Sequence, residues 1–128
     1  MISEKNDISV LLFNTRDELL RVELRKVLYF QADKNYTEVY FVNGYHVNLP
    51  SSMSQIEQLL NNNKLKGRIT PFVRIGRSLI VNLRYILHIR TLKQELILGD
   101  LSCTKVARIP VAKNALKKLK ELYTNKQQ

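Results

Sequence analysis

Short blocks of apolar and β-branched residues recur along this chain, separated by clusters of turn-forming residues. Blocks of this length and composition favour β-strands over helices. Asn43-Gly44, which stands between two such blocks, is the strongest short hairpin signal in the chain. The pattern predicts strands at residues 8–14, 19–24, 27–32, 36–42, 45–49, 86–90, 95–98 and 106–111, and a strand–turn–strand hairpin within 72–82. No β-α-β alternation is present, so a parallel nucleotide-binding sheet is not expected.

Two stretches have helical periodicity instead. The first begins after Pro50, where Ser52 and Gln55 have the spacing of a capping box, as do Ser54 and Glu57. Its apolar positions recur at helical period and are expected to face the core: Met53, Ile56, Leu59 and Leu60. Three asparagines at 61–63 are expected to end this helix, and a basic connector at 64–70 follows. The chain is therefore expected to be mainly β, with small antiparallel sheets, one short internal helix and a C-terminal helix.

The C-terminal helix is expected over residues 112–123. Its apolar face consists of Leu116, Leu119 and Tyr123, and its outer face carries Lys113, Lys117 and Lys120.

The length of 128 residues fits a single domain. Cys103 is the sole cysteine, and no apolar run reaches the roughly 18 residues of a membrane span. Together with an N-terminus that lacks the basic region of a signal peptide, these features predict a cytoplasmic protein.

Charge divides the chain into two unlike halves. Residues 1–63 carry 6 basic and 8 acidic side chains, whereas residues 64–128 carry 15 and 3, so the net charge of +10 arises in the second half. Such a clustered excess of lysine and arginine is typical of nucleic-acid binders. An anionic membrane surface is the competing partner for a basic face of this kind.

The segment Phe72-Val73-Arg74-Ile75-Gly76-Arg77-Ser78-Leu79-Ile80-Val81-Asn82 is the most informative motif. Its turn is expected to hold Gly76, Arg77 and Ser78 at the tip. A guanidinium fork beside a hydroxyl and an exposed backbone N–H suits a phosphate or a guanine edge. The alternative interpretation is an ordinary solvated hairpin tip, and for Arg74 it is a brace that holds the turn. Asn82 is expected to be structural, bonding to nearby backbone.

Catalytic chemistry finds little support in the sequence. His46 and His88 each stand alone within an expected strand, and Cys103 has no catalytic partner in view. Acidic residues are sparse in the basic half, and the four glycines do not form a phosphate loop. We therefore expect a protein that is not an enzyme and needs no metal or other cofactor.

The order of the motifs resembles the LytTR DNA-binding domain family. Residues 27–36 resemble the opening of the family, and residues 72–82 resemble its most specific motif, Phe-x-Arg-Val-His-Arg-Ser-Tyr-Ile-Val-Asn. Residues 109–113 resemble its Ile-Pro-Val-Ser-Arg ending, with Ala112-Lys113 in place of Ser-Arg, and Gly76 replaces the usual histidine. The resemblance divides the chain into an N-terminal extension of strands packed on the domain (1–23), a LytTR-like DNA-binding domain (24–123) and a disordered tail (124–128).

The resemblance also implies a function and a set of contacts. It predicts a sequence-specific transcription regulator, of the output-domain type found in bacterial two-component signalling, that reads major grooves of duplex DNA with loops. The expected DNA contacts are Lys34, Asn35, Tyr36, Arg74, Gly76, Arg77, Ser78, Lys113, Asn114 and Lys117. Because the match uses nearly the whole chain, we expect either a stand-alone regulator without a receiver domain or a regulator whose sensor is a separate protein. We also expect a monomer or weak dimer that occupies two direct-repeat half-sites.

Two other functions remain open from the sequence. The first is binding of RNA or of nucleic acid without sequence preference, with Tyr36, Tyr40 and Tyr45 as a stacking surface. The second is a basic adaptor for an acidic protein or a membrane surface.

Overall fold

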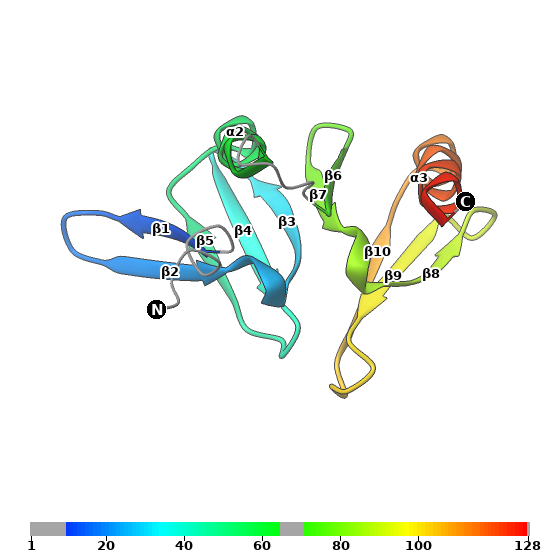
Figure 1. The fold of residues 1–128 in the computed structure, drawn as a ribbon, viewed down its shortest axis with the longest axis horizontal. Helices are drawn as coiled ribbons and strands as arrows, with labels where there is room; N and C mark the ends of the chain where they lie inside the picture. The colour runs from blue at the N-terminus through cyan, green and yellow to red at the C-terminus, as the bar shows by residue number, and fades with distance from the viewer. Residues whose placement is uncertain (1–9, 65–70, 128) are drawn as a thin grey trace.

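The computed structural model describes residues 10–64 and 71–127, which form ten strands and two α-helices (Figure 1). The strands are β1 (Val10–Asn14), β2 (Leu19–Glu23), β3 (Val27–Asp33), β4 (Tyr36–Phe41), β5 (His46–Leu49), β6 (Phe72–Ile75), β7 (Leu79–Asn82), β8 (Ile86–Arg90), β9 (Glu95–Gly99) and β10 (Val106–Pro110). The helices are α2 (Met53–Lys64) and α3 (Lys113–Gln127), and single 3₁₀ turns, η1 (Leu24–Lys26) and η2 (Leu83–Tyr85), precede β3 and β8. In the expected strand at 8–14, residues 8–9 lie outside the described ranges, as do residues 65–70 of the basic connector.

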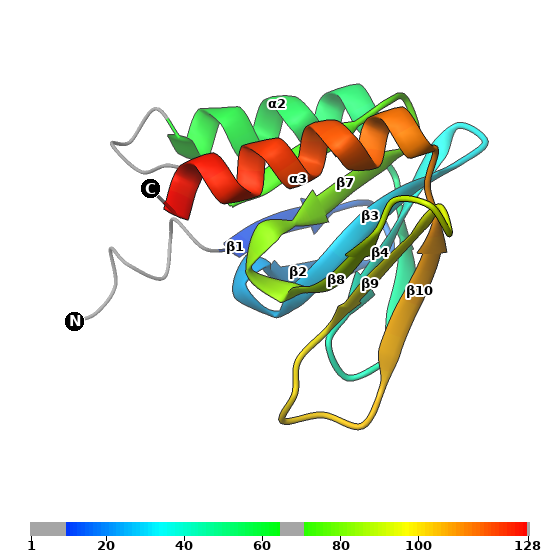
Figure 2. The ribbon, with the colours of Figure 1, turned by 90° about the vertical axis from the view of Figure 1, so that its right-hand side faces the viewer.

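The strands form three antiparallel sheets, which confirms the expected fold class. A central sheet has the order β5-β4-β3-β7-β6, the hairpin β1-β2 forms a second sheet, and β10-β9-β8 form the third. Figure 1 shows the hairpin on one side of the central sheet and the three-stranded sheet on the other. Both helices lie along the same edge of this arrangement, which is the upper edge in Figures 1 and 2.

Two hydrophobic clusters occupy the spaces between these layers. Neighbouring residues of a strand point to opposite faces of a sheet, so Phe30 enters one cluster while Tyr29 enters the other. The first cluster joins the central sheet to α2 and to the β1-β2 hairpin, whose Leu11 and Val22 are buried in it. The second joins the central sheet to α3 and the three-stranded sheet. At about 1.5–3 kcal/mol for each fully buried large apolar side chain, these clusters provide the main force that holds the layers together.

Helix α2 begins with the expected capping box. The Ser52 N–H donates to Gln55 Oε1 over 2.8 Å, and the Gln55 N–H donates to Ser52 Oγ over 3.2 Å. These two bonds satisfy donors that the first turn of a helix leaves free. The alternative box of Ser54 with Glu57 is wrong, because Ser54 already lies inside the helix and the Glu57 carboxylate contacts another part of the protein.

Asn82 has the structural role expected from its place at the end of the hairpin motif. Its side chain is 1% exposed. Nδ2 donates to the Val27 carbonyl over 2.9 Å, and Oδ1 accepts from the Arg84 N–H over 2.9 Å. The amide therefore ties the end of β7 to the start of β3 and caps η2.

Two local features differ from the expectations. The hairpin at Asn43-Gly44 has a three-residue loop, because Phe41 and Tyr45 still pair and the N–H of Gly44, whose φ is 94°, donates to the Phe41 carbonyl.

Helix α3 continues to Gln127, so residues 124–127 are helical and the expected disordered tail is wrong over that range. The Thr124 hydroxyl donates to the Lys120 carbonyl one turn earlier, and no proline or glycine interrupts the segment. Residue 128 lies outside the described ranges.

Candidate nucleic-acid interface

The turn between β3 and β4 lies directly beside the loop between β6 and β7. Strands β3 and β7 are antiparallel neighbours, with Gln31 opposite Leu79. Beyond this pair, the Ala32 N–H donates to the Ser78 carbonyl over 2.9 Å. The two connections therefore leave the same end of the central sheet, although more than forty residues separate them in sequence.

The start of α3 reaches this end from the other side of the molecule. Figure 2 shows the β3–β4 turn, the β6–β7 loop and the first turn of α3 together at its right-hand end. All three segments that were expected to contact DNA are thus gathered on one surface, which we call the loop end: residues 34–36, 76–78 and 113–117.

The β3–β4 turn presents its side chains to solvent. Asp33 pairs with Tyr36, so Lys34 and Asn35 form a two-residue turn, and Lys34 adopts a positive φ of 59°. Lys34 and Asn35 are exposed, and the Tyr36 ring is 54% exposed. The turn offers a cation, an amide and an aromatic face that a ligand can reach without rearrangement of the backbone.

The β6–β7 loop consists of the three expected residues at its tip. Ile75 pairs with Leu79, and Gly76, Arg77 and Ser78 lie between them and are exposed. Gly76 has a φ of 67°, a conformation that glycine adopts without strain. A β-carbon built on Gly76 would meet no other atom within 4 Å, so the surface above the loop is open.

Arg74 supports this loop from beneath. Its Nε donates to the Gly76 carbonyl over 3.1 Å and its Nη2 donates to the Arg77 carbonyl over 2.8 Å. Its Nη1 donates to Glu57 Oε1 of α2 over 2.9 Å. Bonds to three acceptors occupy all three nitrogens of the guanidinium, which favours the bracing role over direct contact with a ligand. The role of Glu57 is not evident from the sequence, in which its spacing from Ser54 suggests a helix cap instead.

Helix α3 points its N-terminus toward the loop end. Ala112, which precedes the helix, has no side-chain oxygen that could cap the free N–H groups of the first turn. Lys113, Asn114 and Lys117 are exposed, whereas Leu116 and Leu119 are buried on the opposite face. The N–H groups of the first turn, the positive end of the helix dipole and two lysines all attract an anion.

Of the three tyrosines named in the RNA hypothesis, Tyr40 is covered by other rings. The Tyr40 ring stacks between Tyr29 at 4.4 Å and His46 at 5.1 Å, measured between ring centroids. Tyr45 stacks on Phe41 at 5.8 Å. Burial, and secondarily the neighbouring Tyr40 and Glu38, raises the pKa of Tyr29 to about 12. Tyr40 thus stabilises the central sheet, whereas Tyr36 and Tyr45 remain 54% and 57% exposed.

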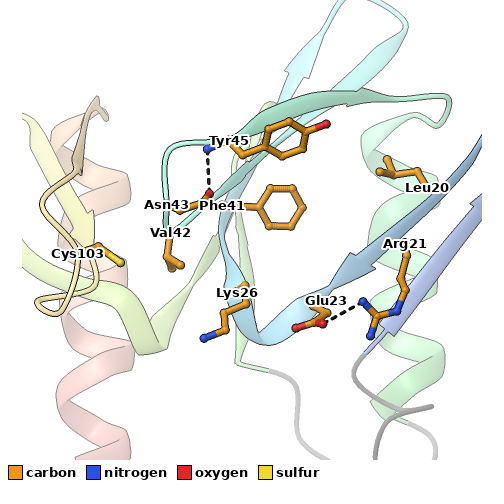
Figure 3. A pocket seen from close by; sticks show the side chains of 9 residues that line it. All are labelled: Leu20, Arg21, Glu23, Lys26, Phe41, Val42, Asn43, Tyr45 and Cys103. Carbon is orange, nitrogen blue, oxygen red and sulfur yellow. Dashed lines mark hydrogen bonds and ion pairs between the residues drawn. The ribbon is translucent and has the colours of Figure 1, made fainter.

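A cleft of about 500 Å³ opens at the opposite end of the central sheet (Figure 3). Its lining includes Phe41, Tyr45, Leu20 and Cys103, and an Arg21–Glu23 ion pair of 2.9 Å borders it.

In the described ranges 10–64 and 71–127, no three His, Cys, Asp or Glu side chains gather where they could hold a metal ion. Over the same residues, no helix is long and apolar enough to cross a membrane.

Comparison with known proteins identifies relatives of this chain and of its fold. The family model described as the LytTr DNA-binding domain matches residues 17–124, a span that includes all three segments of the loop end. A solved LytTr DNA-binding domain from Bacillus cereus is 26% identical, with a TM-score of 0.61, and the match covers 89% of this chain and 95% of that chain. No curated protein matches the chain.

Proposed function

Because the chain belongs to the LytTr DNA-binding domain family, whose model matches residues 17–124, we propose that it reads the sequence of duplex DNA with its loop end. Membership of the family makes it a DNA-binding regulator in general, with DNA as its partner. The proposal adds that the three segments of the loop end enter the major groove and select particular bases.

The observation that carries this proposal is the gathering of three exposed segments on one surface. Arg77, at the tip of the β6–β7 loop, has the fork geometry that binds the O6 and N7 atoms of guanine. Asn35 has the amide that suits the edge of adenine. Lys34, Lys113 and Lys117 pair with phosphates, since a lysine is a point charge with little geometric preference.

The remaining residues of the surface position these contacts. Arg74 holds the β6–β7 loop through the Gly76 and Arg77 carbonyls. Phosphate oxygens accept from the backbone N–H groups near Gly76 and Ser78 and from those of the first turn of α3. The side chain of Asn114 is a further donor to phosphate. Tyr36 packs its exposed ring along the edge of the groove.

A selection from random duplex DNA tests this proposal. The protein is incubated with a random library, the bound duplexes are sequenced over several rounds, and the enriched site is footprinted. We expect one recurring motif with protection in successive major grooves on one face of the helix. Enrichment of no motif, or equal retention of single-stranded RNA, would overturn the proposal.

We further propose that two molecules occupy two similar half-sites arranged as direct repeats. A single module of this size covers about 600–1,000 Å² on DNA, which is a small interface for genome-wide specificity. Sedimentation of the free protein, beside a gel-shift titration on one and on two half-sites, tests this arrangement. We expect a monomer or weak dimer that gains affinity on the double site. A stable free dimer, or full affinity on one half-site, would contradict it.

A further inference from the structure

The loop between β8 and β9, residues 91–94, lies beside the start of α3. Strand β9 is antiparallel to both of its neighbours, and Glu95 pairs with Arg90 of β8 and with Pro110 of β10. The β8–β9 loop and the chain leading into α3 therefore leave the same end of the three-stranded sheet. The Val111 N–H donates to the Gln94 carbonyl over 3.1 Å, which fastens the loop to the segment before α3. Figure 2 shows this loop at the same end as the other three segments.

The loop has a defined conformation and presents two unlike side chains. The Gln94 N–H donates to the Thr91 carbonyl over 3.1 Å, and Gln94 adopts a positive φ of 53°. Leu92 projects from the loop with 82% of its surface exposed, and Lys93 beside it is exposed. A single leucine flanked by polar residues is too small an apolar patch to dock a folded protein. It is large enough to cover one methyl group.

The surroundings of the loop favour an anionic ligand. Glu95 is the acidic residue next to the loop. Its Oε1 lies 3.0 Å from Arg90 Nη1 and 3.5 Å from Arg108 Nη1, so two cations surround one carboxylate. The other acidic residues between positions 83 and 124 are Asp100 and Glu121. Asp100 follows β9 at the other end of the sheet, and Glu121 lies two turns into α3. Neither opposes the approach of a phosphate to Lys93.

We propose that residues 91–94 form a fourth DNA-contacting segment, in which Leu92 packs on the C5-methyl group of a thymine and Lys93 pairs with a phosphate. The inference rests on the proposed function, because it places this loop at the major groove that the start of α3 faces. Thymine alone among the four bases presents a methyl group there, so an apolar side chain distinguishes it from the others. Leu92 is thereby a specificity-determining residue.

The three-stranded sheet supplies matched controls for both side chains. Leu101, which is 86% exposed, and the exposed Lys105 lie in the β9–β10 loop at the opposite end of the same sheet. The variants Leu92→Ala, Lys93→Ala, Leu101→Ala and Lys105→Ala are measured by fluorescence anisotropy on the duplex that the wild-type protein selects. Each thymine of that duplex is also replaced in turn by uracil, which lacks only the methyl group.

We expect one uracil substitution to weaken wild-type binding about fivefold, as partial burial of a leucine side chain implies. Leu92→Ala should bind the thymine duplex about fivefold more weakly and should not respond to that uracil. Lys93→Ala should reduce the salt slope by about one, whereas both control variants bind like wild type. Indifference of the wild type to every uracil, or a Leu92→Ala variant that binds like Leu101→Ala, would overturn the inference. Failure of the wild type to select any duplex would overturn the proposed function with it.

Discussion

Arg74 donates from Nη2 to the main-chain carbonyl of Arg77 over 2.8 Å, so one arginine of the β6–β7 hairpin holds the loop that presents the other. The two side chains differ in their surroundings accordingly. Arg74 also bonds to Glu57 and Gly76 and is partly buried, whereas Arg77 is exposed at the tip. Their substitution should therefore affect different properties of the protein.

Arg74→Ala should lower the free energy of unfolding by about 1–2 kcal/mol, because three charge-assisted hydrogen bonds are lost at a partly solvated site. Urea unfolding measures the change. Arg74→Lys should recover little of it, since an ammonium group cannot span the carboxylate and both carbonyls. Arg21→Ala, which removes an exposed ion pair with Glu23, is the control and should change stability by less than about 0.5 kcal/mol. A fully stable Arg74→Ala protein would refute the bracing role.

Arg77→Ala should leave stability unchanged and weaken binding to the selected duplex by about 1–3 kcal/mol, as loss of a bidentate base contact does. Binding to a scrambled duplex should fall much less. Anisotropy titrations on the two duplexes measure the difference. If both affinities fall equally, Arg77 contacts phosphate and does not read a base.

Asn82→Ala should lower the free energy of unfolding by about 1–3 kcal/mol, because it leaves the Val27 carbonyl and the Arg84 N–H without their partner. The exposed Asn48 of β5 provides a control, and Asn48→Ala should shift stability by no more than about 0.5 kcal/mol. An unchanged melting temperature with lost DNA binding would assign Asn82 to the interface instead.

Tyr29 makes the stability depend on pH in the alkaline range. Its pKa rises from the ordinary value of 10.0 to about 12 in the folded protein, so the unfolded chain releases this proton first. The free energy of unfolding should be constant below about pH 10 and should fall as the pH rises toward 12. Tyr29→Phe keeps the ring stack with Tyr40 and should reduce this slope, as urea titrations at several pH values would reveal. Burial also raises the pKa of Tyr40 and Tyr85, so part of the slope should remain.

Much of the fold follows from local sequence signals. Alternation of apolar residues identifies the strands, because each strand of a half-covered sheet must place every second side chain in a core. The Ser52–Gln55 spacing identifies the start of α2, because both partners of the cap lie within one helical turn. Helix α3 extends beyond the expected end at Tyr123, because no glycine or proline follows that residue to stop the helix.

The site was less accessible to prediction than the fold. The motif at 72–82 predicts an exposed tip at residues 76–78, as the structure has it, yet the partner of Arg74 lies seventeen positions earlier on α2. Whether an arginine meets a ligand or a carboxylate depends on how a helix packs against a hairpin, and no local pattern records that. For a similar reason, no local pattern in the sequence marks Leu92 and Lys93 as candidate DNA contacts. Their place beside α3 arises from the pairing of β8, β9 and β10.

The most direct test of the account compares binding to the selected duplex and to a scrambled duplex across a series of salt concentrations. We predict that the selected duplex binds at least about 10³-fold more tightly at physiological salt. The logarithm of its binding constant should fall against the logarithm of salt with a slope near −5, as contact with roughly six phosphates requires. Equal affinity for the two duplexes, or a slope near zero, would contradict the claim that this chain reads DNA sequence with its loop end.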